Sequence, residues 1–181
     1  MKFILVIVTL FLFNADVTAQ KKYAISFHSY NSAGFVFGRS PASFAAETEN
    51  GIKIKTWFIG AGFGIDNYYR QTLPLFGAIK KEFLLKENRL FLYAKAGRNL
   101  IAKDKTKNVF FSSIKTQGGF YGDAGIGYKI KMYKNNHLYF TVGNSLKHIT
   151  ETETFPDNGF PYYYTTKRKF SRIAIKVGLQ F

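Results

Sequence analysis

The last twelve residues constrain the fold of this chain more than any other stretch. From residue 173 onward every odd position is apolar, whereas the even positions are basic, small or polar. The apolar set is Ile173, Ile175, Val177, Leu179 and Phe181, and the opposite set is Arg172, Ala174, Lys176, Gly178 and Gln180. This period of two predicts a β-strand with one wholly apolar face. A strand that faces lipid on one side and the interior of a closed barrel on the other needs this pattern, so the sequence predicts a transmembrane β-barrel.

Seven further segments fit the same interpretation, with polar clusters marking the breaks between them. The expected strands are residues 23–37, 42–54, 57–68, 72–85, 90–101, 118–132, 137–150 and 162–181. We therefore predict an all-β fold, an eight-stranded antiparallel transmembrane β-barrel with up-and-down meander topology. Short turns at residues 53–56, 86–88 and 134–136 fall at one end, and long loops at residues 102–115 and 151–161 fall at the other. An even number of strands places both termini on one side, which we expect to be the periplasm.

Glycine recurs on one face of the third expected strand. Gly60, Gly62 and Gly64 alternate with apolar residues there. Glycine weakens a strand in water, but on the inward face of a narrow barrel it leaves room for large side chains. This glycine-rich segment lies within an expected strand and is not followed by a helix, so we do not interpret it as a nucleotide-binding loop.

The first nineteen residues have the features of a secretory signal peptide. Met1-Lys2 is followed by an apolar run over residues 3–13 and by Val17-Thr18-Ala19 before the expected cleavage site. The apolar run is too short for a transmembrane helix, which needs about 20 residues. We predict a signal peptide at residues 1–19 and a single barrel domain at residues 20–181.

Net charge and cysteine content limit the classes of partner and of chemistry that this chain can have. The chain carries a formal net charge of +15 and no cysteine, so thiol catalysis and thiolate metal sites are excluded. An exported protein seldom meets nucleic acid, and we expect its counter-charges to be lipopolysaccharide phosphates in a lipid bilayer. The three histidines have no metal-ligand spacing. We expect no cofactor, no metal and no nucleic acid, and a monomeric protein.

Two stretches carry a family resemblance. Residues 57–80, with alternating glycines, an Asp-x-Tyr tip and a Leu-Pro-Leu re-entry, together with the terminal strand, resemble small bacterial outer-membrane β-barrel proteins of the OmpA/OmpX-like, porin-like type. The resemblance implies location in the outer membrane of a Gram-negative bacterium. It also implies that Phe181 is part of the signal read by the barrel assembly machinery. It specifies an architecture and no particular activity.

The inward faces of the expected strands collect thirteen charged residues. They are Glu47, Glu49, Lys53, Asp66, Lys80, Glu82, Lys95, Asp123, Lys129, Lys131, Lys147, Arg172 and Lys176. Buried charges must be paired or hydrated, and eight strands leave space only for side chains. We predict a salt-bridged polar plug, and hence a non-enzymatic barrel with a structural or surface-interaction role. The surplus of Lys and Arg leaves a narrow anion-preferring pore as the alternative.

A third alternative is an enzyme that modifies lipid A at the outer leaflet. His148, Thr150 and Glu151 are similar to the lipid-facing triad of the outer-membrane lipid A deacylase. Here threonine stands where that family has serine, and the small residues that follow the serine there are absent. We expect the chain not to be an enzyme.

The loop at residues 102–115 mixes lysines with aromatic residues. Lys103, Lys105 and Lys107 precede Phe110 and Phe111. The loop is either an ordinary solvated loop or a site that binds anionic glycan or lipopolysaccharide.

Overall fold

The computed structural model describes residues 25–38, 41–67, 69–85, 88–102, 107–109, 112–132, 136–155 and 162–181. Nine strands lie in these residues: β1 (Ile25–Phe37), β2 (Ser43–Ile54), β3 (Trp57–Asp66), β4 (Thr72–Leu85), β5 (Asn88–Ile101), β6 (Lys107–Val109), β7 (Ser112–Lys131), β8 (His137–Phe155) and β9 (Tyr162–Gln180). No helix within the described residues has the length and hydropathy to span a membrane.

The sheet closes on itself. Sequential strands pair antiparallel from β1 to β5, β5 pairs with β7, and β7 continues through β8 to β9. The circle is completed where β9 pairs with β1, for example at Val177 opposite Ala33. Eight strands form the wall, and the three-residue β6 only pairs with the start of β7. The predicted eight-stranded antiparallel meander is confirmed, and within the described residues each strand of the wall pairs with a neighbour on both sides.

Side chains sort by the predicted alternation. Phe27, Ile59 and Ile173 face outward and remain 69%, 57% and 55% exposed, whereas Tyr30 and Phe58 face inward and are fully buried. An outward apolar band and a polar, aromatic interior are the arrangement required of a barrel in lipid. We call the end of the barrel where β1 begins and β9 stops the terminal end, and the opposite end the loop end.

Inward glycines make room for aromatic rings, as the sequence predicted. A Cβ atom at Gly127 would lie 2.2 Å from Cζ of Phe91, and one at Gly178 would lie 2.5 Å from Cζ of Tyr139. Both rings are buried inside the barrel. The glycines therefore set the space into which the large interior residues pack.

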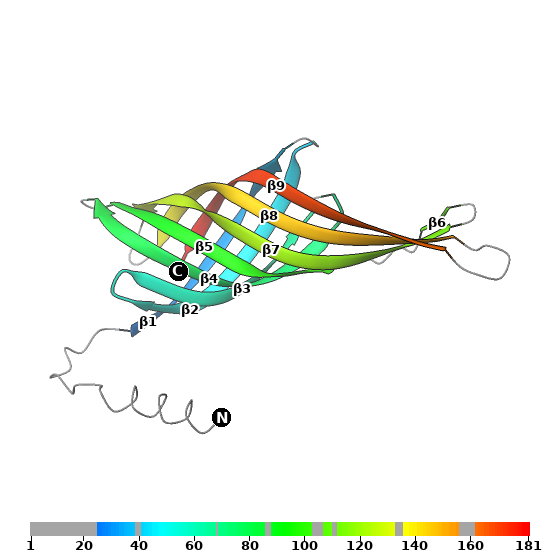
Figure 1. The fold of residues 1–181 in the computed structure, drawn as a ribbon. Helices are drawn as coiled ribbons and strands as arrows, with labels where there is room; N and C mark the ends of the chain where they lie inside the picture. Colours follow the sequence, from blue (N-terminus) through cyan, green and yellow to red (C-terminus); the bar gives the residue numbers. More distant parts are fainter. Residues whose placement is uncertain are drawn as a thin grey trace, which may run out of the picture.

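The strands at the loop end are longer than predicted. β7 begins at Ser112, β8 runs to Phe155, and β9 starts at Tyr162, so residues 112–115 and 151–155, expected in loops, are strand. In Figure 1 these three strands extend well beyond the rest of the barrel, with β6 near their tip. Residues 150–154 show no hydrophobic alternation because both faces of the strand are polar there. The pairing between β8 and β9 nevertheless continues, for instance between Glu153 and Tyr164.

A β-bulge separates this extension from the wall. Gly118 pairs with Ile149 and Tyr121 pairs with Lys147, so two residues of β7 lie opposite His148 alone. Strict alternation would place Thr116 and Tyr121, five residues apart, on opposite faces of β7. Because of the bulge, both side chains are buried. The expected signal peptide at residues 1–19 lies outside the described residues.

Candidate functional site

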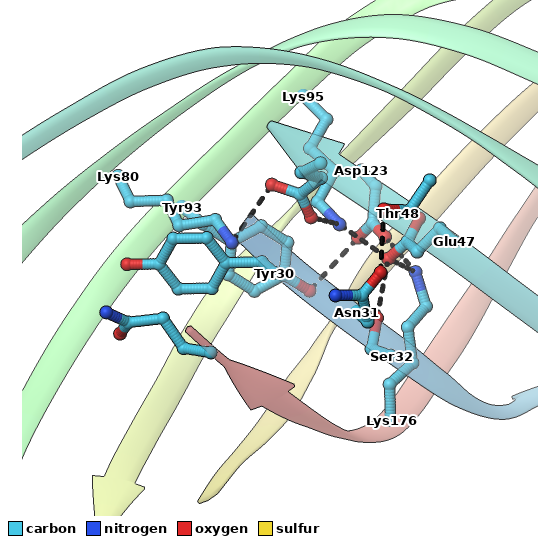
Figure 2. Close-up of polar contacts among 12 residues, drawn as sticks. Tyr30, Asn31, Ser32, Glu47, Thr48, Lys80, Tyr93, Lys95, Asp123 and Lys176 are labelled. Carbon is cyan, nitrogen blue, oxygen red and sulfur yellow. Dashed lines mark hydrogen bonds and ion pairs between the residues drawn. The ribbon is translucent and has the colours of Figure 1, made fainter. Parts of the chain in front are cut away.

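The middle of the barrel is filled by a network of alternating charges. Nζ of Lys95 lies 2.5 Å from Glu47 and 2.7 Å from Glu49, and Nζ of Lys176 lies 2.7 Å from Glu47 and 2.6 Å from Asp123. Figure 2 shows Lys95 and Lys176 converging on Glu47 from different strands. Each of these five side chains is at least nine-tenths buried. Strand alternation aims all of them at the barrel axis, where opposite charges replace the lost water.

Tyrosines complete the hydrogen bonding of this network. The Tyr93 hydroxyl donates to Asp123 at 3.1 Å, and the Tyr121 hydroxyl donates to Glu47 at 3.4 Å. These tyrosines are buried, as are the charged groups that they contact. A buried polar group is costly unless it is paired, so the tyrosines satisfy carboxylate oxygens that the lysines leave open.

An aromatic box lies next to this network on the terminal side. Nζ of Lys80 lies 3.5 Å from the ring centre of Tyr30 and between 5.4 and 5.8 Å from those of Phe58, Phe91 and Tyr139. The same nitrogen is 2.9 Å from Glu49. Cation–π contact and an ion pair therefore hold one ammonium in the centre of the barrel. Four large, buried rings therefore surround one lysine inside the barrel.

Glu82 forms a second charged cluster at the terminal end. Its carboxylate lies 2.5 Å from Lys53 and 2.7 Å from Arg89, and it also accepts from Lys129. Lys129 further donates to Gln180 at 2.5 Å. Three cations thus share one buried carboxylate, and the cluster is more positive than the network above it.

At the loop end, the interior continues with Asp66. Its carboxylate lies 2.5 Å from Nζ of Lys147, and Thr72 donates to the same carboxylate at 2.8 Å. Arg172 is buried at this end and donates to Ser43 at 3.2 Å. Every interior carboxylate of the described strands therefore has a basic partner.

Beyond the wall, Glu151 ties the protruding β8–β9 hairpin to the segment between β3 and β4. It lies 2.7 Å from Arg168 and 3.4 Å from Arg70, and the Tyr69 hydroxyl donates to it at 2.9 Å. Burial alone would raise the pKa of Glu151, but hydrogen bonds from Arg168 and Tyr69 together hold that pKa below its usual value. The pKa of Tyr69 is raised, first by burial and then by its bond to Glu151. We call Tyr69, Arg70, Glu151 and Arg168 the outer clasp.

The structure brings together all but one of the charged residues expected inside. Twelve of the thirteen have an exposed fraction of 8% or less. Lys131 is the exception: it is the last residue of β7 and is exposed, because the strand ends at the mouth and its inward position is open to solvent. The sequence analysis did not identify Arg89, because the expected strand began only at residue 90. In the structure Arg89 lies on the inward side of β5, 2.7 Å from Glu82.

The candidate catalytic triad is not assembled. His148 packs against Phe120 with ring centres 5.7 Å apart on the outer side, whereas Glu151 is buried on the opposite face and bonded to the outer clasp. Residues 148 and 150 share one face of β8 and residue 151 lies on the other, since successive side chains of a strand alternate. The three candidate residues of the enzyme alternative therefore do not lie together as a triad.

The predicted surface-loop residues are only partly described. Lys103, Lys105, Phe110 and Phe111 lie outside the described residues, and Lys107 begins β6. Phe181 is half-exposed at the terminal end, where its backbone exchanges two hydrogen bonds with Ser29. Among the described residues no group of three or more His, Cys, Asp or Glu side chains could hold a metal ion.

No protein-family model matches the chain, and no curated protein matches it in sequence. Among solved structures, the chain is similar to the outer membrane protein AlkL, determined by solid-state NMR in DMPC lipid bilayers. The two share 12% identity with a TM-score of 0.50, over 92% of this chain and 93% of that one. An identity this low shows a shared fold and not a shared activity. The similarity supports the expected resemblance to small outer-membrane barrels without selecting the OmpA/OmpX-like group among them.

Proposed function

We propose that the protein is a non-enzymatic barrel of the outer membrane of a Gram-negative bacterium, with a structural or surface-interaction role and an interior closed by its own side chains. The observation that carries this proposal is the pairing of every described interior carboxylate with a basic side chain. Each interior carboxylate, from Glu82 to Asp66, has a basic partner within 2.9 Å, and the aromatic box around Lys80 fills the space between the two charged clusters. Carboxylates paired in this way leave no activated nucleophile or general base among them.

The proposal includes a topology. After removal of residues 1–19, both termini lie in the periplasm, and the protruding β7–β8–β9 sheet lies outside the cell. This orientation follows the usual asymmetry of short periplasmic turns and long external loops. The barrel assembly machinery reads Phe181, and the mature barrel works as a monomer.

Charge sorting on the protruding sheet supports an interaction with lipopolysaccharide. Lys115, Lys167 and Lys169 are exposed on the face continuous with the lipid-facing side, whereas Glu151 and Glu153 lie on the opposite face. The lysines stand just beyond the apolar band that begins at Ile173 on β9. Cations at this height lie level with the phosphates of the outer leaflet and attract them.

The matching experiment compares two pairs of charge deletions in reconstituted membranes. The Lys167→Gln/Lys169→Gln variant removes two cations of the protruding sheet, and Lys81→Gln/Lys131→Gln removes two at the terminal end. We expect lipopolysaccharide to raise the unfolding temperature of the wild type and the terminal-end variant relative to phosphatidylcholine. In the Lys167→Gln/Lys169→Gln variant we expect about half of this rise in unfolding temperature, or less. In all three proteins we expect the rise to be lost at high salt, because salt screens exposed charges. Equal gains in all three proteins would contradict the proposed contact.

The alternative function is a narrow anion-preferring pore. The described strands bury seven basic side chains and only five carboxylates inside the wall. The basic side chains are Lys53, Lys80, Lys95, Lys129, Lys147, Arg172 and Lys176, and the carboxylates are Glu47, Glu49, Asp66, Glu82 and Asp123. This surplus of positive charge would favour the passage of anions over cations through a conducting barrel. Steady single-channel currents from the purified barrel would select this alternative.

A further inference from the structure

A polar cavity opens at the terminal end, below the Glu82 cluster. Its volume is about 440 Å³, and its lining includes His28, Lys53, Lys55, Arg89, His137 and Gln180. A volume of this size lies within the range of small-molecule sites, about 300–1,000 Å³. We call this cavity the terminal vestibule.

The walls of the terminal vestibule are basic. Among the described residues that line it there is no carboxylate. Glu82 is not part of this lining, but its carboxylate binds Lys53 and Arg89 of the lining as well as Lys129. Lys55 adds a further cation to the lining. The described lining of the vestibule is therefore basic.

The cations are held in place from several directions. Lys53 is fixed by its 2.5 Å contact to Glu82, and Arg89 by its 2.7 Å contact to the same carboxylate. Lys55 lies in the β2–β3 turn with a φ of 56° and lines the cavity. His28 is bonded to Gln180 at 2.8 Å and to Ser26 at 2.9 Å. A guanidinium and two ammonium groups on separate elements, with hydrogen-bonding groups between them, form a preorganised receptor for a tetrahedral oxyanion.

We propose that the terminal vestibule binds a phosphate-bearing ligand. The ligand's phosphate oxygens lie between Arg89 and the ammonium groups of Lys53 and Lys55, and His28, Ser26 and Gln180 contact its polar remainder. The phosphate is supplied either by a soluble phosphate monoester or by a phospholipid headgroup at the rim of the barrel. This site lies at the opposite end from the proposed lipopolysaccharide contact and does not depend on it.

The test is a titration of the full-length mature barrel, isotopically labelled in zwitterionic micelles, with glycerol 3-phosphate. Amide NMR shifts report binding at each residue. We expect saturable shifts centred on residues 53–56 and 88–90 and on the end of β9. The Lys55→Gln variant should bind about 3- to 10-fold more weakly, because it removes one charge-assisted contact from the rim. The matched control Lys167→Gln removes the same charge at the other end and should bind as the wild type does.

A second arm separates the two sources of phosphate. Phosphatidylcholine also carries a phosphate, but its choline cation cancels the net charge. If an anionic lipid headgroup fills the vestibule, the same amides therefore shift without added ligand in nanodiscs of phosphatidylglycerol relative to nanodiscs of phosphatidylcholine. If only glycerol 3-phosphate shifts them, the ligand is a soluble monoester. Shifts in neither arm would overturn the proposal. So would shifts that sodium chloride reproduces at equal ionic strength, or a loss of affinity as large in Lys167→Gln as in Lys55→Gln.

Discussion

Lys176 on β9 contacts Glu47 on β2 across the strand that separates them: Nζ lies 2.7 Å from Oε1, between residues 129 positions apart in sequence. β1 runs between these two strands and pairs with both of them. The last strand of the barrel is therefore tied to the second by a buried ion pair as well as by the β1 ladders. Closure and interior filling are parts of one arrangement.

Removal of the Glu47 charge should destabilise the barrel strongly. Glu47→Gln leaves Lys95 and Lys176 partly unpaired in the interior, and breaking one partner of a buried pair costs about 3–5 kcal/mol. Denaturant unfolding in micelles, followed by the fluorescence of Trp57, the single tryptophan, measures this loss. The control Lys169→Gln changes an exposed residue and should stay within about 0.5 kcal/mol of the wild type. A Glu47→Gln barrel as stable as this control would show that the network does not contribute to stability.

Gly127→Ala should destabilise the barrel through overpacking. The new methyl group would lie 2.2 Å from the ring of Phe91, which is fully buried and has to move. Such insertions cost about 1–3 kcal/mol. The matched control is Gly77→Ala, where the nearest atom to the new methyl is 4.0 Å away. Equal unfolding midpoints for the two variants would contradict the role of Gly127 as space for Phe91.

The outer clasp should open in acid. The pKa of Glu151 in the folded protein is held below its ordinary value of 4.5, so its ionised form stabilises the contact. For a depressed carboxyl pKa this stabilisation is complete above the ordinary value and is lost as the pH falls through the folded one. The hydrogen-exchange protection of residues 162–170, measured relative to the intrinsic exchange rate at each pH, should therefore be high at pH 7 and fall as the pH drops below about 4.5.

Two variants locate this acid response. Glu151→Gln should show low hydrogen-exchange protection of residues 162–170 already at pH 7, with little further change of this protection in acid. Glu153→Gln, two residues away on the same face of β8, should behave as the wild type. A response that persists unchanged in Glu151→Gln would assign it to another group.

The sequence predicted the wall of the barrel well because each strand there has lipid on one side. Successive side chains of a strand alternate between the lipid-facing and the inward face, so Val177 and Lys176 lie on opposite faces. The same alternation predicted that Glu47 and Asp123 lie inside. The partners were not predictable: Lys176 reaches both acids only because of the stagger between strands, which alternation within one strand does not encode.

Where lipid no longer contacts the strands, prediction became less accurate. Thr152 and Glu153 lie beyond the apolar band, so their side chains carry no hydrophobic period, and the extension of β8 is held by backbone pairing and by the outer clasp. The triad of the enzyme alternative is a different case. Strand alternation alone already places Glu151 and His148 on opposite faces of β8.

Single-channel recording in planar lipid bilayers tests the central claim, that the barrel is closed by its own side chains. We predict no unitary conductance from wild-type protein whose folding is verified by faster gel migration before boiling. The triple variant Phe58→Ala/Lys80→Ala/Phe91→Ala removes the centre of the aromatic box and should produce discrete channel openings in the same assay. Sustained unitary currents from the folded wild-type protein would contradict the account and identify the barrel as a pore.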